Sequence, residues 1–277
     1  MPTIPFIKAH ANGNDFLIVE ESAIAAVAPR RHAAVARQLC ARNTSIGADG
    51  IEFLDRRANG ELFLRLFNAD GSEAELSGNG TRCVAAWLAQ SEACNEVVLG
   101  THGGVRTCRV ISSAGSSFEI ESSMGIPRVM RRTIDLPAVG PVEGAMVNVG
   151  NPHFVLFVDP GSAPEDFSAH GLTWQALGAQ IAVSPLFPHG TNVEFVRILS
   201  PSHIAFRIFE RGCGPTTSSG TGTCASATAA IALGSCDRTL TASSEGGSQA
   251  VVWPANDQSM LLTGPAEIIC TGEVSIA

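Results

Sequence analysis

Residues 210 to 225 read Glu-Arg-Gly-Cys-Gly-Pro-Thr-Thr-Ser-Ser-Gly-Thr-Gly-Thr-Cys-Ala, and the rest of the chain is best understood from them. A polar, glycine-rich loop runs here directly into a series of small residues that is typical of a buried helix. The first backbone N–H groups of a helix have no partner within it, and they carry the positive end of the helix dipole. We therefore expect the loop around Ser219, Gly220 and Thr221 to hold a small anion.

The same arrangement occurs once earlier in the chain. Ser77-Gly78-Asn79-Gly80-Thr81 also precedes an apolar helical stretch, and Ser77 lies 142 residues before Ser219, since 219 − 77 = 142. The same offset aligns Ile51-Glu52-Phe53 with Val193-Glu194-Phe195 without a gap. Solenoid repeats recur at roughly 20 to 50 residues, so this longer offset predicts two homologous halves that face each other. Ser77 and Ser219 would then lie across one cleft.

Hydrophobic periodicity and turn signals predict an α+β protein of two pseudo-symmetric lobes. Each lobe is expected to be a mostly antiparallel, curved sheet or barrel around one central helix, with lobes at residues 1–130 and 145–277. The Pro-rich segment 128–145 is expected to be irregular and to contain the linker. The helices expected besides the one after Ser219 are residues 23–40, 81–90 and 168–181. The strands expected are residues 4–20 as a hairpin, 51–54, 61–67, 96–100, 105–112, 117–122, 145–158 as a hairpin, 193–198, 204–209, 251–264 and 267–271.

Composition limits the possible partners. The chain has 277 residues, a formal charge of −8 and 16% charged residues, so a nucleic-acid partner is not expected. Neither a secretion signal nor a membrane span is expected, and the protein should be cytoplasmic. The eight cysteines contain no Cys-x-x-Cys pair, so we expect thiols and no metal site. Cys83 and Cys224, just past the loops, are expected to be buried.

The residue types near the two loops favour an amino-acid ligand. Amides, one arginine and one glutamate can bind carboxylate and ammonium groups, and these candidates are Asn14, Asn68, Asn79, Asn151, Asn192, Glu210 and Arg211. Gly220 to Ala225 imitates a Gly-x-Gly-x-x-Ala dinucleotide fingerprint but lacks a parallel βαβ setting. A Walker-type phosphate loop is excluded because its Gly-Lys-Ser/Thr sequence is absent from the loops.

The order of these motifs resembles the diaminopimelate epimerase family along the whole chain. The motifs are Asn14-Asp15-Phe16, Asn68-x-Asp70-Gly71-Ser72, Gly78-Asn79-Gly80-x-Arg82-Cys83, Gly150-Asn151-Pro152-His153, Thr191-Asn192-Val193 and Glu210-Arg211-Gly212-x-Gly214-x-Thr216. The resemblance implies an enzyme without a cofactor, dimeric in its better-known members, that interconverts LL- and meso-diaminopimelate for lysine and cell-wall synthesis. It also implies that Gly78, Asn79, Gly220 and Thr221 lie at the substrate carboxylate.

In that family each glycine loop begins with a cysteine, and the two cysteines exchange the α-proton on opposite faces of the substrate. Here both positions are serine, Ser77 and Ser219. By resemblance, His153 and Glu210 would tune this catalytic pair. Three accounts remain open: a deliberate double Cys-to-Ser substitution in an ordinary epimerase, a natural relative with altered chemistry or another amino-acid substrate, and a non-catalytic amino-acid-binding relative.

Overall fold

The computed structural model describes residues 3–27, 31–137, 139–159, 161, 163 and 165–276. The chain divides into two compact units: unit 1 comprises Met1–Ser123 with Thr263–Ala277, and unit 2 comprises Met124–Leu262. The last strand therefore belongs mainly with the first half, because β17 pairs antiparallel with β1, as in the pair Thr3 with Ser275. None of the described helices is long and apolar enough to cross a membrane.

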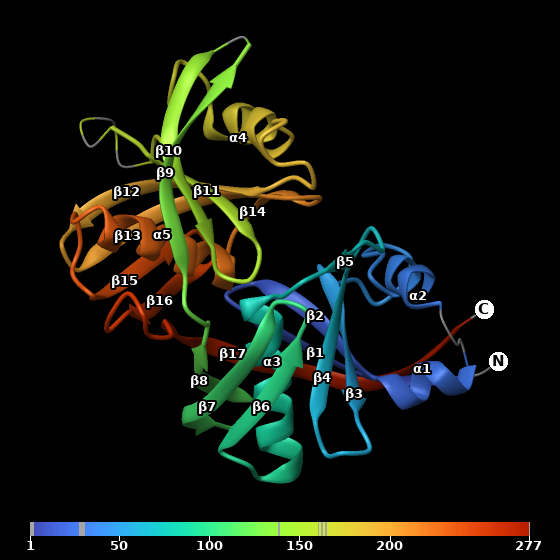
Figure 1. Ribbon diagram of the computed structural model, residues 1–277. Helices are drawn as coiled ribbons and strands as arrows, with labels where there is room; N and C mark the ends of the chain where they lie inside the picture. The colour runs from blue at the N-terminus through green and yellow to red at the C-terminus, as the bar shows by residue number, and fades with distance from the viewer. Residues whose placement is uncertain are drawn as a thin grey trace. The chain divides into compact units, whose positions relative to one another are not determined.

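Unit 1 is a set of strands around one long helix, α3 (Figure 1). Its elements in chain order are β1 (Thr3–Ala11), β2 (Asn14–Glu20), α1 (Glu21–Val27), α2 (His32–Leu39), β3 (Gly50–Arg56), β4 (Leu62–Asn68), β5 (Glu73–Ala74), α3 (Gly78–Glu92), β6 (Glu96–Thr101), β7 (Gly104–Ala114), β8 (Ser117–Ser123) and β17 (Leu261–Ser275). Strand β1 pairs antiparallel with β2, β3 with β4 and β6 with β7, whereas β2 with β3 and β4 with β6 are parallel pairs.

Unit 2 repeats this order around α5. Its elements are β9 (Arg128–Leu136), β10 (Gly140–Asn148), β11 (Pro152–Phe157), α4 (Trp174–Ala182), β12 (Asn192–Ser200), β13 (His203–Glu210), β14 (Gly214–Thr216), α5 (Gly220–Ala232), β15 (Thr239–Ser244) and β16 (Gly247–Val252). The two parallel pairs recur in equivalent places, as β11 with β12 and β13 with β15.

The predicted repeat is confirmed by strand register. Ile51 pairs with Phe67 in unit 1 and Val193 pairs with Phe209 in unit 2, and both members of the second pair lie 142 residues after the first, since 193 − 51 = 209 − 67 = 142. The helix starts Gly78 and Gly220 obey the same offset, since 220 − 78 = 142. The α+β fold of two similar halves is therefore confirmed.

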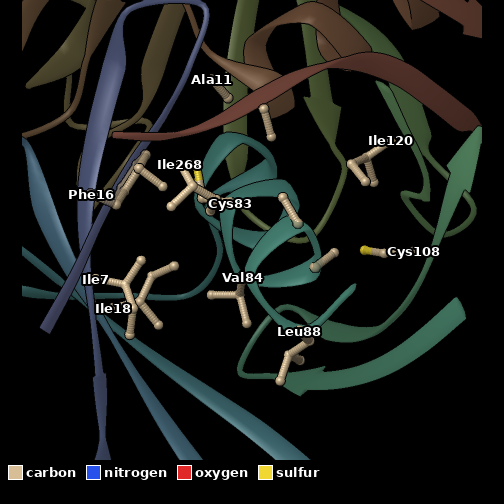
Figure 2. Close-up of a cluster of buried hydrophobic side chains, with 14 of the residues drawn as sticks. Ile7, Ala11, Phe16, Ile18, Cys83, Val84, Leu88, Cys108, Ile120 and Ile268 are labelled. Carbon is tan, nitrogen blue, oxygen red and sulfur yellow. The ribbon is translucent and has the colours of Figure 1, made fainter. Parts of the chain in front are cut away.

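The core of unit 1 is built on α3. Cys83, Val84 and Leu88 point from this helix into a buried cluster that includes Ile7 and Ile18 from the first hairpin (Figure 2). Burial raises the pKa of the Cys83 thiol to about 12, so this thiol is a small apolar core group, as predicted.

In unit 2, α5 is buried around nearly its whole circumference, which explains its run of small residues. Residues from Gly220 to Ile231 are all buried, and the helix contacts β10, β11, β12, β13, β15 and β16. A helix surrounded on all sides by strands has no solvent face, so its sequence is small and weakly amphipathic. The buried Cys224 lies in this run, as predicted.

Four sequence expectations are wrong in detail. The expected strand 251–264 is not continuous, because β16 ends at Val252 and β17 begins at Leu261. Segment 128–145 is not irregular, because β9 and β10 pair over nine residues from Gly140 with Leu136 to Asn148 with Arg128. The expected helix 168–181 begins only at Trp174, where Thr173 is the N-cap. The expected helix 23–40 is two helices, α1 and α2, and residues 28–30 between them lie outside the described residues.

Candidate active site

Ser219 is the N-cap of α5. Its Oγ accepts a hydrogen bond from the Gly222 backbone N–H at 3.2 Å, and the residue is 6% exposed. The hydroxyl therefore occupies the position where the free N–H groups of the first turn converge. An anion bound beside Ser219 would meet the same N–H groups and the positive end of the helix dipole.

Ser77 has the same role in unit 1. It is the N-cap of α3, and its Oγ accepts from the Gly80 N–H at 3.0 Å. Extended backbone angles at both serines (φ −120° at Ser77 and −147° at Ser219) are those of ordinary N-caps. The predicted approach of Ser77 and Ser219 across one cleft stays a prediction.

Removing the cap at Ser77 should cost stability independently of any catalytic role. We expect Ser77→Ala to lower the free energy of unfolding by about 1 kcal/mol, because one N–H group of the first turn loses its acceptor. Urea denaturation measures this loss. The control is Ser91→Ala in the last turn of the same helix, where the hydroxyl only donates to the Trp87 carbonyl. Equal stability of the two variants would contradict the capping assignment.

A buried glutamate lies behind each of these helix starts. A Cβ added to Gly80 would lie 2.1 Å from Oε1 of Glu52, and one added to Gly222 would lie 3.1 Å from Oε1 of Glu194. Glu52 is 2% exposed and Glu194 is 0% exposed. Burial raises the pKa of both carboxyl groups, that of Glu52 to about 8. The glycines are therefore required for close approach as well as for the loop.

In unit 1, a chain of amide hydrogen bonds joins the loop to the first hairpin. The Asn79 side chain donates to Oδ1 of Asn14 at 3.0 Å, and Asn14 donates to Oδ2 of Asp49 at 2.6 Å. Arg82, fully buried, donates to Oδ1 of Asn79 at 2.6 Å. The structure thus brings Asn14 and Asn79 together beside the start of α3.

Asp49 is itself held by charged neighbours. Arg42 donates to Asp49 at 2.6 Å and to Asp15 at 2.7 Å, and Lys8 lies 3.1 Å from Asp15. Burial alone would raise the pKa of Asp15, but the hydrogen bonds and charges of Arg42 and Lys8 outweigh it and lower that pKa. Arg42 therefore connects Asp15 with Asp49, the carboxyl group that accepts from the Asn14 amide.

In unit 2, the equivalent network contains a histidine. His153 on β11 lies with Nδ1 2.6 Å from Oε1 of Glu194 and with Nε2 2.8 Å from Oδ1 of Asn151. Asn151 then donates to the Thr221 hydroxyl at 3.3 Å. The structure brings four residues together at the start of α5: three that the sequence singled out, Asn151, His153 and Thr221, and one that it did not, Glu194.

Asn192, Glu210 and Arg211 form a second group in unit 2. The Asn192 side chain donates to the Pro152 carbonyl at 3.2 Å and accepts from the Arg211 backbone N–H at 2.9 Å. The Arg211 guanidinium donates to the His189 carbonyl at 3.3 Å. Glu210 accepts from the Thr216 hydroxyl. These contacts fix Asn192 and Arg211 relative to each other through the backbone.

Asn68 lies at the end of β4, in the turn that precedes the first loop. Its side chain donates to the Ser72 hydroxyl at 3.0 Å, and Ser72 in turn donates to Asp70. Asp70 and Ser72 are exposed, so this turn lies at the surface of unit 1, where Arg37 also donates to the Asp70 carbonyl at 3.3 Å. The sequence predicted the turn, while a contact of Asn68 with a ligand stays a prediction.

Comparison with known proteins identifies the family. The family model described as "Diaminopimelate epimerase" matches residues 6–130 and 145–269. The chain belongs to the diaminopimelate epimerase family. The family model covers both halves of the repeat that strand register defines.

Relatives in this family match the chain over almost its full length. A diaminopimelate epimerase of Nostoc punctiforme is 36% identical, covering 98% of this chain and 99% of its own length. One of Moorella thermoacetica is 34% identical, covering 97% of this chain and 98% of its own.

Solved structures of more distant proteins share the fold. A probable proline racemase of Agrobacterium radiobacter superposes with a TM-score of 0.73 at 16% identity, covering 99% of this chain and 93% of that one. A hydroxyproline epimerase of Agrobacterium vitis gives 0.72 at 15% identity, covering 99% and 92%. At this level of identity the likeness concerns the fold alone, and it extends the family's two-unit architecture to other racemases and epimerases.

Proposed function

We propose that this chain is a cofactor-independent amino-acid epimerase of the diaminopimelate type whose turnover is impaired or abolished by serine at positions 77 and 219. The observation that carries the proposal is the pair of capped helix starts at Ser77 and Ser219, at equivalent positions of the repeat in a member of this family. Diaminopimelate is the substrate that the names of its relatives give.

The proposed chemistry removes the α-proton on one face of the substrate and returns a proton on the other. The carbanion formed next to the carboxylate is stabilised by the N–H groups and dipoles of the two helix starts, around Gly78 and Asn79 and around Gly220 and Thr221. The base must have a pKa near the working pH. A thiol at a helix N-terminus satisfies this condition, whereas an unassisted serine hydroxyl ionises far less readily.

The remaining site residues would bind the substrate and tune the reacting pair. We assign the carboxylate and ammonium groups of diaminopimelate to the amide and charged side chains of Asn14, Asn68, Asn151, Asn192, Glu210 and Arg211. Glu210 and His153 are proposed to influence the groups at positions 77 and 219. A cytoplasmic location and a homodimer belong to this proposal by family resemblance.

Serine at both thiol positions favours a second candidate function. A non-catalytic amino-acid-binding protein would keep the anion-binding helix starts and lose only the acid and base. An epimerase of another amino acid is the third alternative. Calorimetry with meso- and LL-diaminopimelate against glutamate and histidine tests the ligand: tight binding of diaminopimelate alone supports the proposal, and preference for another amino acid contradicts it. Restoration of turnover by Ser77→Cys together with Ser219→Cys distinguishes the proposal from a non-catalytic binding protein.

Arg211→Ala should remove most of the affinity for diaminopimelate. A guanidinium binds a carboxylate through two parallel hydrogen bonds, and loss of such a pair costs roughly 2 kcal/mol or more, a factor of about 30 in the dissociation constant. Isothermal titration with meso-diaminopimelate measures the change.

The matched control for Arg211→Ala is Arg238→Ala, another arginine of unit 2, which donates to the Asn256 side chain at 2.8 Å. This control should bind like the parent protein. If Arg211→Ala bound the ligand as tightly as Arg238→Ala, the assignment of Arg211 to a substrate carboxylate would be wrong.

A further inference from the structure

Glu194 is a buried carboxyl group whose side chain contacts the imidazole of His153. It lies on β12 and is 0% exposed, and its Oε1 is 2.6 Å from Nδ1 of His153 on the parallel neighbour β11. Its second oxygen, Oε2, has no hydrogen-bond partner among the described residues. Burying a carboxyl group costs free energy unless hydrogen bonds compensate for the lost water, so the contact with His153 is expected to have a role.

The contact begins a chain of four hydrogen bonds that ends at Ser219. From His153 Nε2 the chain passes to Asn151 Oδ1 at 2.8 Å, from Asn151 Nδ2 to Thr221 Oγ1 at 3.3 Å, and from Thr221 Oγ1 to Ser219 Oγ at 3.4 Å. Each link lies within unit 2.

The chain fixes where the protons of the histidine lie. An amide oxygen can only accept, so Nε2 of His153 must carry hydrogen to reach Oδ1 of Asn151. This leaves Nδ1 to share one proton with Oε1 of Glu194. In this arrangement Nε2 is the donor to Asn151 and presents no lone pair to a substrate.

In unit 1 no histidine occupies the position that corresponds to His153. Glu194 corresponds to Glu52, since 194 − 142 = 52, and both are buried. His153 pairs in register with Asn192, whereas the residue in register with Gly50, the equivalent of Asn192 since 192 − 142 = 50, is Phe16. In unit 1, Asn14 takes its orientation from Asp49 instead.

We propose that Glu194 is a positioning residue that acts through His153: it holds the imidazole as an Nε2–H donor, which orients the Asn151 amide so that its NH2 group faces Thr221 and position 219. Thr221 Oγ1 accepts from Asn151, so its own proton is available to Ser219 Oγ. The consequence for ligand binding rests on the proposed function, because Asn151 and Thr221 are binding residues only within it. The proton assignment stands on geometry alone.

Nuclear magnetic resonance of the ¹⁵N-histidine-labelled full chain, without ligand, tests the assignment directly. We expect His153 to show a protonated Nε2 in a single state, and Glu52→Gln to leave these signals unchanged. Glu194→Gln keeps a hydrogen-bond partner for Nδ1 and should preserve the Nε2–H form, whereas Glu194→Leu should give mixed tautomers. A bare Nε2 in the parent protein overturns the proposal.

A second experiment measures the affinity of the Glu194 variants for meso-diaminopimelate by isothermal titration calorimetry. Glu194→Leu should weaken binding about tenfold, and Glu194→Gln should stay within about threefold of the parent, since it retains the hydrogen bond. Equal losses in the two variants, or no loss in Glu194→Leu, overturn the positioning role. If the parent protein does not bind diaminopimelate at all, the proposed function fails, and the tautomer of His153 still decides the proposal about Glu194.

Discussion

Replacing Ser77 and Ser219 together by cysteine is expected to raise the rate of epimerisation by at least about 10³-fold, because it supplies a base and an acid with suitable pKa values. A helix N-terminus lowers a thiol pKa from about 8.5 towards neutrality, and both positions are N-caps. The measurement is proton nuclear magnetic resonance of LL- and meso-diaminopimelate in heavy water, where inversion places deuterium at the α-carbon of the product.

The single variants Ser77→Cys and Ser219→Cys are the controls for the double variant. Each supplies only one of the two faces, so each should exchange the α-hydrogen of at most one stereoisomer, with little net inversion. The idea of disabled thiol positions would be wrong if the double variant remained inactive on every amino acid tried. It would be equally wrong if the serine form already turned over at about 1 per second or more, a rate typical of enzymes.

The internal repeat is predictable from the sequence, because two similar segments at a constant offset can be recognised along the chain itself. A fixed offset that places Glu52 on Glu194 also places their strands, and the structure pairs β3 with β4 and β12 with β13 in the same register. Turn residues and loop glycines added the helix starts. Elements whose pattern is local were therefore predictable, and their boundaries followed within a few residues in most cases.

The hairpin of β9 and β10 was not predictable in the same way. Pro137, Pro141 and three arginines in residues 128–145 favoured an irregular linker. In the structure Pro137 lies in the turn and Pro141 is only the second residue of β10, so the prolines interrupt little of the ladder. The first residues of a strand tolerate proline, whereas a proline at the centre would remove a hydrogen bond from the ladder.

The site shows a similar limit. The sequence singled out His153 and Asn151 from their motif, but their partner Glu194 lies on another strand and appears in the sequence as one polar residue among apolar neighbours. The signal was present, since Glu52 and Glu194 are aligned glutamates within two apolar strands. The sequence pattern does not predict the contact of Glu194 with His153, because this contact depends on the register between the parallel strands β11 and β12.

Glu52→Gln is expected to stabilise the protein increasingly as the pH rises. Burial raises the pKa of Glu52 from 4.5 to about 8. Between these values the unfolded chain has released the proton and the folded chain still holds it, so each pH unit costs the folded state about 1.4 kcal/mol. The cost therefore begins near pH 4.5 and reaches up to about 5 kcal/mol at pH 8, and a neutral glutamine does not incur it.

Urea denaturation at pH 5, 6.5 and 8 measures this effect of Glu52→Gln. The difference in free energy of unfolding between variant and parent should be small at pH 5 and grow to several kcal/mol at pH 8. Glu61→Gln is the control, because Glu61 is an exposed glutamate of the same unit and its pKa is lowered by the Asn59 side chain and by Arg57. This control should gain nothing as the pH rises. A difference for Glu52→Gln that stays constant from pH 5 to 8 would mean that Glu52 is ionised behind Gly80 in the folded protein, with the start of α3 stabilising its charge.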